Sequence, residues 1–179
     1  MLYLRKIDID AWADKGPEDS DSITDLKTSN HELSVWKLKD LASLNSIVLA
    51  LAMTMSKPIS FTAVLIDPDD MNTKQGWSPE IKDQPGSTIF SSMINEHKNF
   101  IVENLEHLSL LSTYIHNIIN NRQSDKIINI NEIQINQLLE EQIKSGVFSE
   151  TNIDVSDKNK SGKWIKIIKE LQETLTKKK

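Results

Sequence analysis

Three closely spaced carboxylates, Asp67, Asp69 and Asp70, are the residues of this sequence best suited to chemistry. They follow directly after an apolar segment, residues 59–66, that we predict to be a buried strand. Mg²⁺ prefers oxygen ligands such as carboxylates, and a metal-dependent hydrolase uses such a set to position the ion and activate water. The spacing is therefore compatible with a metal-dependent hydrolase.

The same carboxylates also fit a purely structural role. An Asp-Pro pair such as Asp67-Pro68 is common in turns at the end of a strand. Asp8 and Asp10, near the end of another predicted strand, could join the acidic cluster, but no basic residue lies beside it at a spacing known from nucleases. We therefore favour the turn, and we predict no metal ligand.

Histidine is the other residue type that could bind a metal here. Glu103 and His107 are four residues apart, whereas metal sites in helix bundles use Glu-x-x-His from two helices. No second copy of the pattern is present, and His97 lies on the apolar side of a predicted helix, which favours a core histidine. The remaining two histidines are His31 and His116.

The composition excludes several kinds of active site. The chain has no cysteine, so it has no disulfide, thiol nucleophile or cysteine-bound zinc. Its five glycines never occur at the spacing of a phosphate-binding loop, and no serine nucleophile elbow is present. We predict no catalytic residue and no cofactor, and we lean against an enzyme.

Tryptophan and lysine are the residue types that could contact partners. Trp12 lies at the end of a predicted strand and Trp77 in the long predicted loop, and loop tryptophans are enriched in binding hot spots. Each could instead fold back over the sheet, which we favour. The C-terminal lysines Lys163, Lys166 and Lys169 could contact nucleic acid. The net charge of −5 and the nearby glutamates favour a solvated helix face instead.

Apolar periodicity predicts the elements that position these residues. We predict strands at 2–9, 33–38 and 59–66, and a short strand or linker at 124–131. Helices are predicted at 41–55, 132–145 and 162–175, and residues 67–87, rich in Gly and Pro, are predicted to be one long loop.

Residues 88–122 contain neither Gly nor Pro and carry one apolar stripe at helical spacing. A continuous helix there would be roughly 50 Å long. It must therefore break, near 97–99 or 112–113, or project from the globule and need a partner to cover it. The stripe supplies further candidate contact residues: Leu105, Leu108, Ile115 and Ile119.

The expected fold class is α+β. A small N-terminal sheet of about three strands with a packed helix is followed by a mainly helical C-terminal half containing one long helix. We expect lobes at 1–86 and 87–179, with one continuous domain as the alternative. The composition, 38% hydrophobic and 26% charged, is that of a folded protein.

We expect a soluble, cytoplasmic bacterial protein. Charges begin at Arg5, which argues against a signal peptide, and the apolar run at 46–56 is shorter than the about 20 residues that span a bilayer. The expected function is a non-catalytic accessory subunit of a multi-component system, of the antiviral defence or toxin–antitoxin type. Its expected partner is a larger protein encoded nearby or a second copy of itself.

Overall fold

The computed structural model describes residues 1–26, 30–121 and 123–177. It divides into two compact units, each assembled from three segments of the chain. Unit 1 comprises Met1–Lys39, Phe61–Gln84 and His97–Asn129, and unit 2 comprises Asp40–Ser60, Pro85–Glu96 and Ile130–Lys179. Both units take residues from before and after position 87, and the expected lobes 1–86 and 87–179 stay a prediction.

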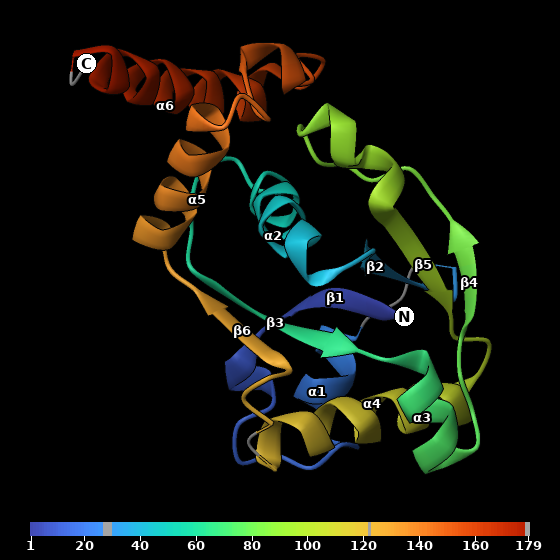
Figure 1. The fold of residues 1–179 in the computed structure, drawn as a ribbon. Coiled ribbons are helices and arrows are strands. Elements are labelled where there is room, and N and C mark those ends of the chain that lie inside the picture. Colours follow the sequence, from blue (N-terminus) through green and yellow to red (C-terminus); the bar gives the residue numbers. More distant parts are fainter. Residues whose placement is uncertain (27–29, 122, 178–179) are drawn as a thin grey trace. The chain divides into compact units, whose positions relative to one another are not determined.

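Unit 1 contains a six-stranded sheet, of which only Ile130 is counted in unit 2 (Figure 1). The strand order is β4-β5-β2-β1-β3-β6. β1 pairs antiparallel with β2 and β3, and β5 pairs antiparallel with β2 and β4. The strands are β1 (Leu2–Ile7), β2 (Glu32–Leu38), β3 (Phe61–Ile66), β4 (Glu80–Asp83), β5 (His97–Ile101) and β6 (Ile127–Ile130).

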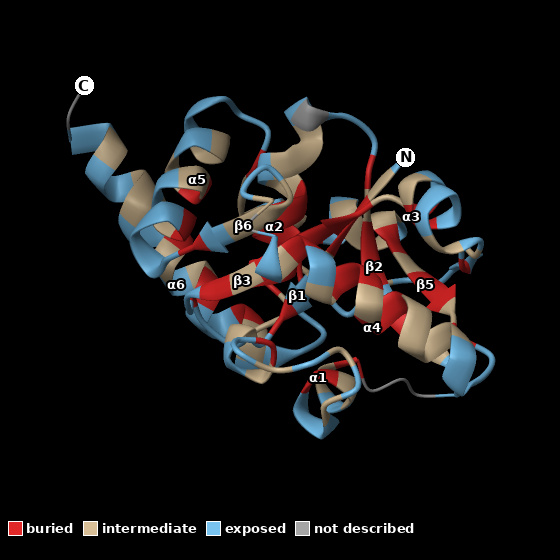
Figure 2. Cartoon of the chain, turned by 90° about the horizontal axis from the view of Figure 1, so that it is seen from below, coloured by how far each residue is buried: buried red, intermediate tan, exposed pale blue. Residues whose placement is uncertain are grey.

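One face of this sheet packs with helices into the core of unit 1. Its helices are α1 (Ser20–Asp25), α3 (Pro68–Gln75), α4 (Leu105–Asn120) and the short 3₁₀ helix η1 (Ile9–Ala11). Val35, Val64 and Phe100 from the strands share this core with Met71 of α3 and Ile115 of α4. Figure 2 shows buried positions concentrated along β1, β2, β3 and β5.

Unit 2 is helical. It contains α2 (Leu44–Ala52), α5 (Glu132–Lys144), α6 (Lys158–Lys177) and the 3₁₀ helices η2 (Leu41–Ser43), η3 (Ser91–Glu96) and η4 (Glu150–Asn152). Asn131 and Gln134 form a capping box that begins α5. Trp164 of α6 is fully buried and its Nε1 donates a hydrogen bond of 2.9 Å to the carbonyl of Met55. This contact anchors α6 within its unit.

The mixed α and β class is confirmed, since half of the residues are helical and a fifth lie in strands. The strands predicted at 2–9, 33–38 and 59–66 are confirmed as β1, β2 and β3, and β3 lies inside the sheet as its apolar sequence indicated. The helices predicted at 41–55, 132–145 and 162–175 correspond to α2, α5 and α6, the last beginning at Lys158. Within the described residues, no helix combines the length and the apolar character needed to cross a bilayer.

The expected number of about three strands is wrong, because the sheet has six. β6 lies in the segment 124–131 that was predicted as a short strand or linker, and two further strands were hidden from periodicity. All four residues of β4 are exposed, so this strand lies inside the predicted loop 67–87 without any apolar alternation. The same loop contains α3. Its helix signals are the N-cap Asp67, Pro68 in the first turn and Gly76 as left-handed C-cap.

The long helix predicted over 88–122 is also wrong. This stretch contains η3, then β5, then α4, and residue 122 lies outside the described residues. The apolar spacing matched a helix only because residues from three separate elements happened to fall in phase. The strand occupies 97–101, where one of the two predicted breaks was placed, so no single apolar rod projects from this stretch.

Candidate functional site

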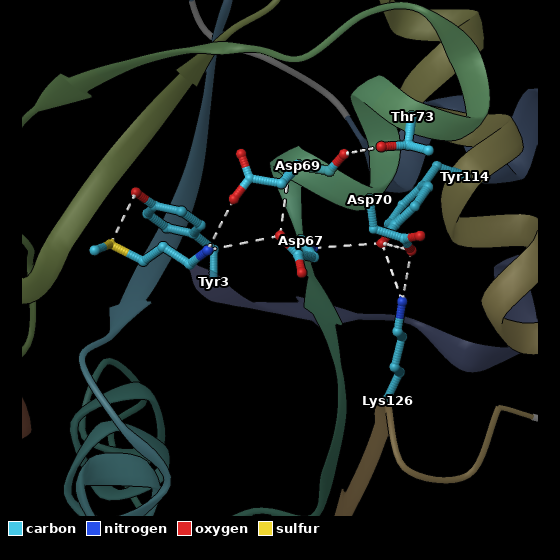
Figure 3. A network of polar contacts seen from close by, with 8 residues as sticks. Tyr3, Asp67, Asp69, Asp70, Thr73, Tyr114 and Lys126 are labelled. Atoms are coloured by element: carbon cyan, nitrogen blue, oxygen red, sulfur yellow. Dashed lines mark hydrogen bonds and ion pairs between the residues drawn. The ribbon is translucent and has the colours of Figure 1, made fainter.

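Asp70 lies at the centre of a polar network that joins three parts of unit 1 (Figure 3). Its Oδ2 accepts a hydrogen bond of 2.8 Å from the Tyr114 hydroxyl on α4. The same atom lies 2.8 Å from Lys126 Nζ, just before β6, and 2.9 Å from Lys74 Nζ on α3. Lys126 also donates to the Tyr114 hydroxyl at 3.2 Å. The network therefore holds α3, α4 and the start of β6 together.

The contacts of this network keep Asp70 ionised, Lys126 protonated and Tyr114 neutral. The hydrogen bond from Lys126 holds the pKa of Asp70 well below its usual range, against the opposing effect of burial. Burial lowers the pKa of Lys126, but hydrogen bonds to Asp70 and Tyr114 outweigh it and the net shift is upward. Burial, with the bond to Asp70, raises the pKa of Tyr114. None of these shifts brings a group toward proton exchange near neutral pH.

Asp67 and Asp69 are also engaged locally. Asp67 is the N-cap of α3, and its side chain accepts a hydrogen bond of 3.2 Å from the Asp69 backbone N–H. The amino group of Met1 lies 3.6 Å from Asp67 Oδ1 and 3.3 Å from Asp69 Oδ2. The three carboxylates thus begin a helix and bind cations of the chain itself.

A capping variant separates the two interpretations of Asp67. We expect Asp67→Ala to lower the free energy of unfolding by about 1 kcal/mol, because it leaves an N–H of the first turn of α3 without its partner. Asp67→Asn should stay close to wild type, because asparagine caps helices equally well. Both results should be the same with and without Mg²⁺ in thermal unfolding. A Mg²⁺-dependent stabilisation that disappears in Asp67→Asn would instead support the metal hypothesis.

Asp8 and Asp10 do not join this cluster, because the antiparallel register separates them. Ile7 at the end of β1 lies opposite Thr62 near the start of β3. Asp67 follows the other end of β3, roughly 20 Å away along the strand. Within the described residues, no group of three or more Asp, Glu or His side chains could hold a metal ion.

Asp8 and Asp10 instead line an open cleft of about 450 Å³ in unit 1. Asp21 in this cleft forms an ion pair with Lys15. Asp25 accepts hydrogen bonds from the Trp12 indole at 2.7 Å and from the Asp8 backbone N–H at 3.2 Å. Asp8 caps η1 by accepting a hydrogen bond of 3.3 Å from the Asp10 backbone N–H, so three of the four carboxylates are used to fasten the segment after β1. The cleft is lined by Asp8, Asp10, Ala11, Lys15, Asp21, Thr24 and Asp25.

The histidines are dispersed. His97 is buried in β5, as a core histidine should be, with Nδ1 2.8 Å from the Gln84 carbonyl and its ring edge-to-face with Trp36. Burial lowers the pKa of His97. His116 Nε2 lies 2.8 Å from the Lys15 carbonyl. These two contacts hold backbone carbonyls of neighbouring loops in place. Neither contact joins a histidine to a second catalytic side chain.

Five of the six residues predicted to contact a partner pack against the core of unit 1, and Trp77 is one of them. Trp12 and Ile115 are fully buried there, so neither side chain contributes to a surface. Leu108 and Ile119 are partly buried against the same core. The apolar stripe of α4 faces the sheet, which explains why these α4 residues are buried. Trp12 folds back over the sheet, which is the interpretation that we favoured from the sequence.

Trp77, partly buried against that core, and Leu105 both lie near the first turn of α4. Trp77 is half-buried and stacks on His107, with ring centroids 4.5 Å apart. Leu105, at the first position of α4, is 83% exposed. Three residues after Trp77 the chain enters the exposed strand β4. We call Trp77, the first turn of α4 (105–107) and β4 the β4 corner.

Sequence reasoning missed the strand of this corner. Ile81 is 40% exposed and stands between Glu80 and Lys82, a charged-apolar-charged alternation too short to register as a strand. The only available signal was its position between the C-cap Gly76 and the proline at 85.

Among the described residues, Lys163, Lys166 and Lys169 of α6 form no concentrated basic surface. Lys166 lies 3.9 Å from Glu170, and Lys169 lies 3.6 Å from Glu150. Lys163 is exposed on the same helix. Because two of the three lysines have an acidic neighbour, this geometry favours the solvated-face interpretation over a phosphate-binding one.

No family model, curated protein or solved structure matches this chain. Its function therefore has to follow from its own geometry. Two features of unit 1 are informative: carboxylates largely engaged with partners in the same chain, and an apolar corner left accessible.

Proposed function

We propose that this chain is a non-catalytic interaction subunit that binds another protein through the β4 corner. The observation that supports this most directly is Leu105, which is 83% exposed at the start of α4, two residues before His107, whose ring stacks on the half-buried Trp77. A leucine side chain that is exposed to water at the start of a helix contributes no stabilisation through burial. Tryptophan is enriched in binding hot spots, and Trp77 is partly exposed near the same end of α4.

The state of the polar residues supports the same proposal. Asp70, the carboxylate with the most strongly shifted pKa, is neutralised by Lys74 and Lys126 and fixed by Tyr114. A catalytic carboxylate needs a free coordination site or a pKa near the working pH. Asp70 has neither property, so the metal-dependent hydrolase is the weaker hypothesis.

The expected biological setting remains that of an accessory subunit working with a larger protein encoded nearby, in a defence or toxin–antitoxin type of system. Size-exclusion chromatography with light scattering, of the chain alone and with the products of neighbouring genes, tests it. We expect a complex of defined stoichiometry with one of these products or with a second copy. A strictly monomeric chain that binds none of them would contradict the proposal.

A charge placed on the β4 corner should prevent this binding. We expect Leu105→Asp to weaken the complex by about 2 kcal/mol, because a hot-spot leucine is replaced by a charge that must be desolvated. Ile133→Asp, at a 69% exposed position of α5, is the matched control and should bind like wild type. Isothermal titration calorimetry gives both affinities, and equal losses in the two variants would place the interface elsewhere.

A further inference from the structure

Strand β4 has an open hydrogen-bonding edge. It is the first strand in the sheet order, and among the described residues no strand pairs with its outer side (Figure 1). All four of its residues are exposed. The backbone N–H and C=O groups along such an edge can pair with another strand, and the same strand of a second copy is one such partner.

The two faces of β4 differ in chemistry. Ile81 lies opposite Phe100, which is fully buried in the core of unit 1. The Ile81 side chain is therefore on the core face of the sheet, and it is 40% exposed there. Glu80 and Lys82 are on the other face, because successive side chains of a strand alternate. Each face thus carries one kind of contact, apolar on one side and ionic on the other.

The charges of β4 are not equivalent. Glu80 forms no ion pair with any residue that the structure describes, so the strand begins with one uncompensated carboxylate. Lys82 forms an ion pair with Glu32 of β2. Because an ammonium group has three donors, Lys82 can bind a second carboxylate beside Glu32. β4 therefore presents an unmatched anion and, two residues later, a cation able to bind it.

Backbone geometry limits how two β4 strands can pair. The N–H and C=O groups of a residue point to one side of the strand, and that side alternates along the chain, so a twofold antiparallel pair is centred on a residue that faces itself. Centring on Glu80, Lys82 or Asp83 would place like charges directly opposite each other, which is destabilising. Centring on Ile81 places the two Ile81 side chains together and Glu80 opposite Lys82 on both sides of the axis. Within β4, this is the register in which every facing charge is matched.

We propose that two copies of this chain pair their β4 strands antiparallel about a twofold axis at Ile81, with Glu80 of each copy bound to Lys82 of the other. The proposal rests on the proposed function and names a second copy as the occupant of β4 within the β4 corner. Opposite-charge and apolar cross-strand pairs both stabilise adjacent strands. Because both copies use the same edge, the assembly closes at two and leaves no β4 edge for a third copy.

Analytical ultracentrifugation of the full-length chain tests the charge pairing. We expect a reversible monomer–dimer equilibrium for wild type. Glu80→Lys should weaken the dimer about tenfold, because each Lys82 then faces a second cation, whereas Glu141→Lys on α5 is the matched control and should dimerise like wild type. Lys82→Glu should weaken the dimer for the converse reason. An equimolar mixture of Glu80→Lys and Lys82→Glu should form a mixed dimer more tightly than either variant pairs with itself, and circular dichroism should show both variants folded.

Cysteine cross-linking tests the register. The chain has no cysteine, so Ile81→Cys introduces one thiol per copy, at the axis. The Cβ atoms of directly opposite residues are about 4.5–5.5 Å apart, close to the separation that a disulfide needs. We expect oxidised glutathione to convert Ile81→Cys into a covalent dimer much faster than Ile133→Cys, the control at a 69% exposed position of α5.

Self-pairing is overturned by any of four results. These are a wild type that stays monomeric up to about 1 mM, a Glu80→Lys variant that dimerises like wild type, a charge-variant mixture that forms no mixed dimer, and equal cross-linking of Ile81→Cys and Ile133→Cys. Any of them together with a complex formed with a natural partner would leave the proposed function standing and remove self-pairing alone. A monomeric chain that binds no partner would overturn both.

Discussion

Replacing Trp12 by alanine is expected to lower the free energy of unfolding by about 3–5 kcal/mol. The side chain is fully buried in the core of unit 1, and its indole nitrogen donates a hydrogen bond of 2.7 Å to Asp25. The substitution therefore creates a cavity and removes a donor from a carboxylate. Urea unfolding followed by circular dichroism measures the loss.

Trp12→Phe provides the matched control, because it keeps most of the ring volume and removes the hydrogen bond. We expect its destabilisation to be clearly smaller than that of Trp12→Ala. If Trp12 were a surface contact for a partner, Trp12→Ala would leave stability within about 0.5 kcal/mol of wild type and would weaken binding instead. That outcome would contradict the burial described for this residue.

Replacing Asp70 by asparagine is expected to lower the free energy of unfolding by about 2 kcal/mol at neutral pH. The substitution removes the charge that pairs with Lys126 and Lys74, and it leaves Lys126 partly buried beside Tyr114. A partly buried ammonium without its carboxylate is costly. Thermal and urea unfolding of the two proteins at the same pH give the difference.

The pH dependence of this difference has a definite sign. The pKa of Asp70 is lowered in the folded chain, so its stabilisation is complete above the unfolded value of about 3.9 and is lost as the pH falls below it. Wild type and Asp70→Asn should therefore converge in stability in acid. The pKa of Lys126 is raised, so its share is lost only above about pH 10.4. A constant difference between pH 3 and pH 7 would contradict this account of the network.

The parts of the fold that followed from the sequence are those whose burial alternates or repeats regularly. β1, β2 and β3 lie inside the sheet, so their apolar residues had to appear in the sequence pattern. α5 and α6 bury one face each and showed helical spacing for the same reason.

The edge of the sheet could not be predicted in this way. β4 is exposed at all four residues, so nothing in its side chains distinguishes it from a loop, and its pairing is made by the backbone and by ion pairs to other strands. β5 was absorbed into a false helix because Asn99 is a buried polar residue that hydrophobic periodicity counts as solvent-facing, and because His97 fell on the apolar side of the predicted helix. Both failures come from tertiary pairing that a local pattern does not contain.

Of the residues that the sequence proposed as partner contacts, the structure leaves Leu105 exposed and Trp77 half-buried, and their role in binding stays a prediction. Trp12 and Ile115 were identified by the same reasoning and are buried, because spacing alone does not tell which side of an element faces the core. The engagement of Asp70 with Lys126 joins residues 56 positions apart and could not be read from the sequence.

Hydrogen–deuterium exchange of the chain alone and in its complex with a co-eluting protein tests the central claim most directly. The account predicts slower exchange on binding in residues 77–83 and 103–108, with the rest of the described chain unchanged. Slower exchange confined to α6, or to the cleft lined by Asp8 and Asp10, would contradict binding at the β4 corner.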